Sequence, residues 1–414
     1  MSANQILTGI GIIVGLAVIC QLVAPYLRVP ALVLLLPAGF IAGILCSDVD
    51  PLAIFGNAFT PLVNIAVGLI LFHGGLELVE DRVERTDRRI VHRLIWIGSL
   101  ITWTCATLAA YFLLGVSDQL ALLLGAIVIV SGPTVVGPLL SFVKPDKRIR
   151  RILAWEGTLI DPVGALIAVI VFEAVQALGA PTLSGALGHF LESILIGAAG
   201  GVIGLGLIWL GLRLAGPNRL LGTQVLLGTV ILVTALTDVV SDDSGLVAAV
   251  SMGMVAPLIV KQRLEHVKPF FDTIVTFSIG VLFVAISSLV TPGSLKGLVW
   301  PSLAIVALLV LVVRPGLALL LTIRTTLKFR ERMFIGWMAP RGIVAAATAA
   351  SFSATLISAN FPGAEKLLPV TFVIIAGTVV FYSATAVPMA TLLKVRVPES
   401  GADKDTAEHK VPQT

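Results

Sequence analysis

Long apolar stretches separated by short polar connections make up most of the sequence. A helix needs about 20 mainly apolar residues to cross a bilayer, and the apolar stretches reach or approach this length. We therefore predict an all-α protein with about thirteen membrane spans, of which the second and ninth are short enough to be packed inside the bundle. The predicted spans are residues 5–26, 30–46, 52–74, 92–115, 119–143, 151–178, 185–212, 221–240, 245–260, 270–291, 299–323, 333–357 and 366–393.

Composition agrees with an integral membrane protein. The chain is 57% hydrophobic and only 13% charged, whereas soluble domains are typically about 25% charged. We expect one transmembrane domain at residues 1–393 and a short disordered tail at 394–414. Cys20, Cys46 and Cys105 all fall in apolar runs, which is typical of buried small hydrophobes rather than of a metal site or disulfides.

The basic residues predict the orientation of the chain. Outside the spans, Lys and Arg gather in the odd-numbered connections and in the tail, and the even-numbered connections hold only Lys296 and Lys366. Basic connections stay on the cytoplasmic side of the cell (inner) membrane, so the N-terminus is predicted outside and the C-terminus in the cytoplasm. The net charge of +4 then reflects topology and contact with the lipid bilayer, and no nucleic-acid partner is expected.

The number of spans allows two halves of opposite orientation. Residues 1–178 and 221–393 would each hold six spans and would be joined by the span at 185–212. Such inverted repeats are common among secondary transporters.

The fifth span of each half carries Pro and Gly near mid-membrane. The sequence SGPTVVGP begins at Ser131 and includes Gly132 and Pro133, and APRGIVAA includes Pro340 and Arg341. Both spans are predicted to be discontinuous helices, and breaks at matching positions of the two halves indicate a transport site.

Few charged residues lie deep inside the predicted spans: Glu156, Asp161, Arg314 and Arg341. Such a group costs at least about 2.5–3.5 kcal/mol at the bilayer centre and usually faces a cavity or a partner. Glu156 and Asp161 point apart, because five residues correspond to about 140° around a helix. We predict that Glu156 forms a structural ion pair with Arg341, whereas Arg314 serves packing or a second ion pair. Asp161 would remain without a partner.

The neighbours of Asp161 suit a small cation. Gly157 and Gly164 share its helix face and leave room for another backbone. Pro162 has no N–H, so the carbonyl of Thr158 loses its helical partner. An acid and a carbonyl at one level are hard oxygen ligands for an alkali cation.

The first break offers further oxygens. Pro133 frees the carbonyl of Ile129 in the same way, and the hydroxyls of Ser131 and Thr134 lie in the same stretch. Each Pro can alternatively be a simple kink. An uncompensated carboxylate here could hold either a proton or a cation, which is the minimal device for exchanging one for the other.

Two titratable residues nearer the span ends are more ambiguous. His73, in the third span, is either a satisfied interfacial histidine or a pH sensor. Asp238, with Asp242 and Asp243, forms either a solvated loop or an outer funnel that attracts cations.

Four motifs, LFHGGLEL, SGPTVVGPLL, WEGTLIDPVGA and APRGIVAAA, resemble in this order those of the NhaP-type sodium/proton exchangers, a group of monovalent cation:proton antiporters. The resemblance covers the whole chain except the tail. It implies thirteen spans, crossed broken helices, and a homodimer whose core domain moves against an interface domain. It also implies that Asp161 is the ion-binding aspartate, that Glu156 and Arg341 are the buried ion pair, and that Ser131 offers its backbone carbonyl.

The sequence departs from this family at four positions. Ile160 stands where many members have Asn, Gly132 where many have Asp, His73 where many have Glu, and Gly157 where many have Ser. A cyanobacterial subgroup with GPT and LIDP is similar. Asp161 would be the only side-chain carboxylate of the site, which leaves the choice of ion open.

The expected function is electroneutral exchange of Na⁺, or of K⁺ or Li⁺, for H⁺ by alternating access, with a role in pH homeostasis. One carboxylate cannot readily exchange two protons for one cation, which favours 1:1 exchange. A cation channel or an exchanger that prefers K⁺ or Ca²⁺ is the alternative. No nucleotide-binding, Ser/His/Asp or HExxH motif occurs, so neither an enzyme nor a cofactor is expected.

Overall fold

The computed structural model describes residues 1–396 except 28, 81–84, 177–182, 242–243 and 265–266. Helices make up this part of the chain, with one isolated antiparallel bridge between Pro145 and Arg396. The elements are α1 (Ala3–Leu27), α2 (Leu32–Leu45), α3 (Pro51–Phe55), η1 (Gly56–Ala58), α4 (Phe59–Glu80), α5 (Arg85–Leu114), α6 (Asp118–Ile129), α7 (Pro133–Val143), α8 (Lys147–Gln176), α9 (Leu183–Ala215), α10 (Arg219–Val240), α11 (Ser244–Leu264), α12 (Lys268–Ser288), α13 (Val299–Leu308), η2 (Leu309–Val313), α14 (Arg314–Leu321), α15 (Phe329–Trp337), α16 (Ile343–Ser358), η3 (Ala364–Lys366) and α17 (Leu367–Leu392).

The helices coincide with the predicted apolar stretches. Nine helical segments of the described chain are long and apolar enough to cross a membrane by length and composition. Four further apolar helices are shorter: Leu32–Leu45, Asp118–Ile129, Ser244–Ile259 and Ile343–Ser358. Two of these, α6 and α16, belong to the stretches that contain Pro and Gly, and the other two are the short second and ninth stretches. Whether all four complete a crossing stays a prediction.

The two predicted breaks are present. Residues 130–132 separate α6 from α7, and residues 338–342 separate α15 from α16. Gly132 has extended backbone and Pro133 is the first residue of α7, a position where Pro costs no hydrogen bond because the first N–H groups of a helix have no intrahelical partner. Pro340 similarly interrupts the second stretch and disfavours helical backbone in the residue before it.

A third irregularity was not expected from the sequence. The stretch at 299–323 consists of α13, the π-helical turn η2 and α14 rather than one uniform helix. Pro315 lies just after the turn and has no N–H for the carbonyl of Leu311. The wider π turn absorbs this lost bond and places Arg314 at the start of α14.

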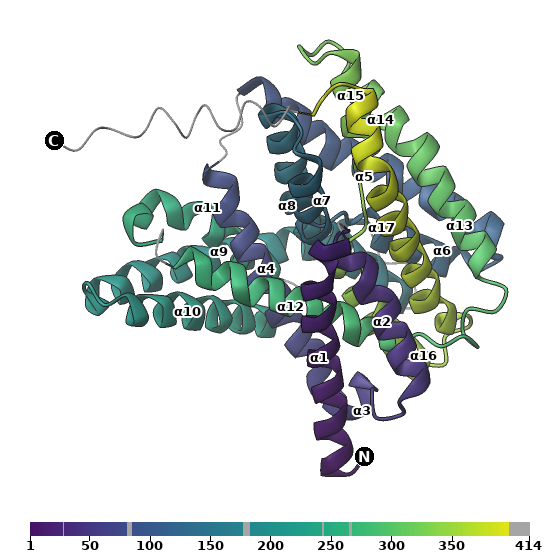
Figure 1. The fold of residues 1–414 in the computed structure, drawn as a ribbon, viewed down its shortest axis with the longest axis horizontal. Coiled ribbons are helices and arrows are strands. Elements are labelled where there is room, and N and C mark those ends of the chain that lie inside the picture. The colour runs from purple at the N-terminus through teal and green to yellow at the C-terminus, as the bar shows by residue number, and fades with distance from the viewer. Residues whose placement is uncertain (28, 81–84, 177–182, 242–243, 265–266, 397–414) are drawn as a thin grey trace.

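The helices form two groups that meet at α8 and also where α16 packs against α4 and α12 and where α17 packs against α2. In the first group, α4 and α9 each pack against α10 and α11, and α12 joins this group to α1 and α2. In the second group, α5 packs against α6, α13 and α14, and α17 packs against α7, α13 and α16. Helix α8 contacts α5, α6, α7 and α16 on one side and α4, α9 and α11 on the other. Figure 1 shows α9–α12 on one side of the molecule and α5, α13 and α17 on the other.

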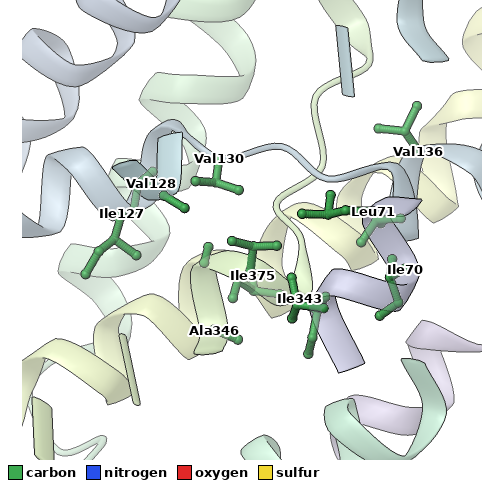
Figure 2. Packing of buried hydrophobic residues seen from close by; sticks show 14 of the residues in the cluster. Ile70, Leu71, Ile127, Val128, Val130, Val136, Ile343, Ala346 and Ile375 are labelled. Carbon is green, nitrogen blue, oxygen red and sulfur yellow. The ribbon is translucent and has the colours of Figure 1, made fainter. Parts of the chain in front are cut away.

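Apolar side chains surround both breaks (Figure 2). They come from the first break and from α4, α6, α7, α16 and α17, and Figure 2 labels Ile70, Leu71, Ile127, Val128, Val130, Val136, Ile343, Ala346 and Ile375. Backbone that is not helical in such surroundings must find its hydrogen-bond partners within the protein. The ends of the helices at both breaks therefore need hydrogen-bond partners from other parts of the protein.

The start of the tail is docked. The carbonyl of Val395 accepts a hydrogen bond from the N–H of Asp146 at 2.9 Å, and Val395 is buried. Disorder was predicted for the whole of 394–414, and the docked residues 394–396 depart from it; residues 397–414 lie outside the described residues.

Candidate functional site

Asp161 lies on α8 and faces the break between α6 and α7. Its side chain is completely buried, and neither carboxylate oxygen has a hydrogen-bond partner among the described residues. The carboxylate abuts the break, because a Cβ added to Gly132 would lie 2.8 Å from Oδ2 of Asp161. Only glycine at this position allows the acid to approach the backbone so closely.

The start of α7 favours a negative charge at Asp161. Gly132 immediately precedes α7, and the first N–H groups of a helix carry a partial positive charge without intrahelical partners. Helix α8 also lies directly against the break, since a Cβ on Gly164 would come within 2.5 Å of Cγ2 of Val130.

The remaining ligands of an ion at Asp161 would have to be hydroxyl or carbonyl oxygens. No three His, Cys, Asp or Glu side chains gather into a metal-binding cluster in the described part of the chain. Thr158, one helical turn before Asp161, is buried, as are Ser131 in the break and Gly157 on α8. The predicted contribution of the Thr134 hydroxyl lies outside the described side chains, as does the ring of Pro133.

Glu156 pairs with Arg314, and the predicted pair with Arg341 is therefore wrong. Nη1 and Nη2 of Arg314 donate to Oε1 and Oε2 of Glu156 at 2.5 and 2.6 Å. This bidentate pair is buried and joins α8 to the start of α14. The π turn explains the difference, because it brings Arg314 to the buried side of its helix, where Glu156 offers two charged oxygens.

Arg341 instead binds the end of α6. Its Nη1 donates to the carbonyl oxygen of Ile129 at 2.8 Å. This carbonyl was predicted to be free for a cation because Pro133 removes its helical partner. The carbonyl of Ile129 does lack a helical partner, as predicted, but the guanidinium of Arg341 binds its oxygen. Ile129 is thus not available as an ion ligand in this arrangement.

Each broken helix consequently has an arginine at the carbonyl end of its first half. Arg341 binds Ile129, the last residue of α6, and Nη2 of Arg314 donates to the carbonyl oxygen of Met338, just after α15, at 3.3 Å. Helix C-terminal ends carry a partial negative charge and unpaired carbonyls. The two arginines balance this negative charge and bind the unpaired carbonyls, which allows α6 and α15 to end inside an apolar core.

Two residues of α17 take part in this arrangement and were not predicted. The hydroxyl of Thr378 accepts a hydrogen bond from the backbone N–H of Arg341 at 3.2 Å. Tyr382 is fully buried beside Arg341 and Arg314 and interacts with the backbone of Ala339. Their spacing of four residues on one helix was the available signal, since such residues share one face.

His73 and Asp238 contact residues of the first helix group. Nε2 of His73 lies 3.1 Å from Oδ1 of Asp272, which connects α4 to α12. Asp238, at the end of α10, accepts from the N–H of Gly245 at the start of α11 at 2.9 Å and from Asn64 at 3.2 Å. Asp238 thus links the end of α10 to the start of α11 and to α4, whereas Asp242 and Asp243 lie outside the described residues.

Two kinds of sequence comparison relate this chain to the same group of membrane transporters. A sequence model described as "Sodium/hydrogen exchanger, transmembrane" matches residues 13–392. The K(+)/H(+) antiporter NhaP of Alkalimonas amylolytica is 25% identical over 97% of this chain and 69% of its own length. The probable Na(+)/H(+) antiporter 2 of Methanocaldococcus jannaschii is 25% identical over 92% of this chain and 95% of its own length.

The fold is that of a solved transporter. The structure of the sodium proton antiporter MjNhaP1 from Methanocaldococcus jannaschii at pH 8 superimposes with a TM-score of 0.81 at 20% identity, over 95% of this chain and 99% of that one. An electron-microscopy structure of the same antiporter gives 0.78 at 21% identity over 96% and 100%. The helical breaks and the buried carboxylate therefore occur within a fold that is already known.

Proposed function

The chain belongs to the transmembrane sodium/hydrogen exchanger family, and from this premise we propose that it exchanges an alkali cation for a proton at Asp161. The observation that carries the proposal is the position of this carboxylate, which is fully buried against the break before α7 and has no hydrogen-bond partner among the described residues. A buried acid of this kind is stable when it holds a proton or when it binds a cation. Because the proton and the cation compete for the same carboxylate, binding of one releases the other, and this competition is the basis of the proposed exchange.

The first helix group and the second provide the two bodies that alternating access requires. Asp161 lies on α8, which contacts both groups. We propose that the second group moves as a core against the first, so that Asp161 faces one side of the membrane and then the other. Thirteen spans arranged as two inverted halves, a homodimer, insertion in the inner membrane and an outside N-terminus belong to the same proposal.

The exchange is proposed to be electroneutral. Glu156 is matched by Arg314, so that Asp161 is the carboxylate left to titrate at the break. One carboxylate can release one proton for each monovalent cation it binds. Turnover should therefore be insensitive to the membrane potential.

The identity of the cation is open to a direct experiment. Relatives of comparable identity are named for K⁺ and for Na⁺, so both ions are candidates. The purified protein in proteoliposomes with an imposed ΔpH should dissipate the gradient when an alkali cation is added. The assay is titrated with Na⁺, Li⁺, K⁺ and Ca²⁺, with and without an imposed potential.

Two outcomes would contradict the proposal. A clear dependence of the rate on the potential would exclude electroneutral exchange. Persistent single-channel currents without proton movement would instead favour a cation channel.

Replacing Gly132 by Ala is expected to weaken cation binding while the protein still folds. The new Cβ would lie 2.8 Å from Oδ2 of Asp161, and a carboxylate at the end of a side chain can move aside. We expect the apparent KM for the cation to rise by about tenfold, which corresponds to about 1.4 kcal/mol. The measurement is the rate of ΔpH dissipation as a function of cation concentration.

Gly137→Ala is the matched control. Gly137 lies on α7, the helix that Gly132 precedes, and an added Cβ there would meet nothing within 4 Å. Because Ala is the better helix former by roughly 0.5–1 kcal/mol, this variant should keep the wild-type KM and lose no stability. Equal KM values for the two variants would contradict the placement of Asp161 against Gly132.

A further inference from the structure

A groove of about 570 Å³ lies where the two helix groups meet. Its walls come from α5 and α8 on one side and from α9 and α11 on the other. The lining residues are Arg88, Val91, His92, Ile95, Trp96, Trp155, Leu159, Pro162, Val163, Leu166, Ile194, Val247, Val250, Ser251 and Met254.

Apart from Ser251, whose hydroxyl donates to the carbonyl oxygen of Ala248 on its own helix, the lining is apolar except at one end. Arg88 and His92 lie one turn apart near the start of α5, and both are exposed. The described residues that line the groove include no carboxylate. The described part of the groove thus offers a positive charge at its mouth and mainly hydrocarbon surface beyond it.

The length of the groove corresponds to one leaflet of a bilayer. Along α8 it extends from Trp155 to Leu166, and eleven residues of helix rise by about 16 Å. The hydrocarbon core of a bilayer is about 30 Å thick. The mouth lies toward the starts of α5 and α8, where basic connections are predicted to meet the headgroups, so the far end reaches approximately the bilayer centre.

We propose that this groove binds an anionic phospholipid, with one acyl chain between α8 and α11 and the phosphate on Arg88. Charge complementarity selects an anionic headgroup, and the depth of one leaflet fits an acyl chain. Trp96 and Trp155 line the groove, and tryptophan is enriched where headgroups meet hydrocarbon.

The lipid and the ion would occupy opposite faces of one helix. Pro162 lines the groove, whereas the preceding Asp161 faces the break at Gly132. A bound chain would therefore contact the helix of the ion site without reaching the carboxylate. The site is distinct from the one that carries the proposed exchange, and lipid binding can be tested without any transport measurement.

Bromine-labelled lipids test the proposal, because bromine quenches tryptophan fluorescence at short range. The full-length protein is reconstituted in phosphatidylcholine with a minor fraction of dibrominated phosphatidylglycerol or, in parallel, dibrominated phosphatidylcholine. The difference between wild type and a Trp155→Phe variant isolates the groove from exposed tryptophans such as Trp96 and Trp209. The groove signal should be quenched at several-fold lower fractions of the anionic lipid.

Arg88→Gln should reduce this preference by about fivefold, the factor that corresponds to one basic residue near an anionic surface. Arg89→Gln is the matched control: the neighbouring residue is also exposed on α5 but does not line the groove. Val163→Phe, which puts a ring into the groove, should lower quenching by both lipids.

Equal quenching by the anionic and zwitterionic lipids in wild type would overturn the proposal. So would equal losses in Arg88→Gln and Arg89→Gln, since any nearby positive charge would then account for the preference. Quenching that is unchanged in Val163→Phe would place the lipid outside the groove.

Discussion

Proteoliposomes that contain the Asp161→Asn variant are expected to show no cation-driven dissipation of ΔpH. Asn has a similar volume and occupies the same buried position against Gly132, but it can neither release a proton nor supply a negative charge to a cation. Both half-reactions of exchange fail together, so the rate should fall to that of liposomes without protein. The measurement is the fluorescence of a pH-sensitive dye inside the vesicles after addition of Na⁺ or K⁺.

Asp118→Asn is the control for the loss of a charge. Asp118 is the exposed first residue of α6, the helix that ends at the break, and it should be replaceable with little effect on transport. Retained exchange by Asp161→Asn would eliminate the mechanism, because the other buried carboxylates among the described residues, Asp87 and Glu156, are paired with Arg148 and Arg314.

Loss of either partner of the Glu156–Arg314 pair is expected to be the largest destabilisation in this molecule. Both side chains are buried, and their two hydrogen bonds measure 2.5 and 2.6 Å. Removing one partner leaves an uncompensated buried charge, which typically costs about 3–5 kcal/mol. Glu156→Gln and Arg314→Met should each lower the temperature at which detergent-solubilised protein loses its monodisperse peak.

The double variant identifies the partner. Replacing both residues removes the charge problem and should restore part of the lost stability, since buried ion pairs are often replaceable by apolar residues. A double-mutant cycle for Glu156 and Arg314 should therefore give a large coupling energy, and a cycle for Glu156 and Arg341 a smaller one. The reverse order would contradict the pairing described above.

The architecture followed from the sequence because a bilayer imposes length and composition on its helices. Apolar runs of about 20 residues located the elements, and α1, α10 and α12 begin and end within a few residues of the predicted bounds. The breaks were equally accessible, because Pro133 and Pro340 remove backbone donors and leave helix interruption as the simplest outcome.

The pairing of the buried arginines was not accessible from the sequence. A buried guanidinium needs an acceptor, but the sequence does not say whether this is a carboxylate or the carbonyl end of a helix. The α6 terminus provides the second kind of acceptor for Arg341, at Ile129. The π turn before Arg314 shifts the faces of the following helix, so that helical spacing from α13 cannot predict where Arg314 points.

The separation of the two acids on α8 was predictable from geometry alone. Five residues turn the helix by about 140°, and in the structure Glu156 contacts α14 whereas Asp161 faces Gly132. Spacing within one continuous helix is a local property, and it is preserved whatever the helix packs against. Contacts between helices depend on the whole fold. The sequence therefore predicted that the two acids point in different directions, but it did not predict which residue pairs with Glu156.

The arginine at the end of α6 has a consequence for the valence of the transported ion. With Glu156 matched by Arg314, the charges nearest the first break are the carboxylate of Asp161 and the guanidinium of Arg341 on Ile129. A proton or a monovalent ion brings Asp161 to neutrality. A divalent ion would leave an excess positive charge in a medium of low dielectric, where unbalanced charge is costly. The site would then discriminate first by the charge of the ion and only second by its radius. We expect it to exclude Ca²⁺ more strictly than it distinguishes K⁺ from Na⁺.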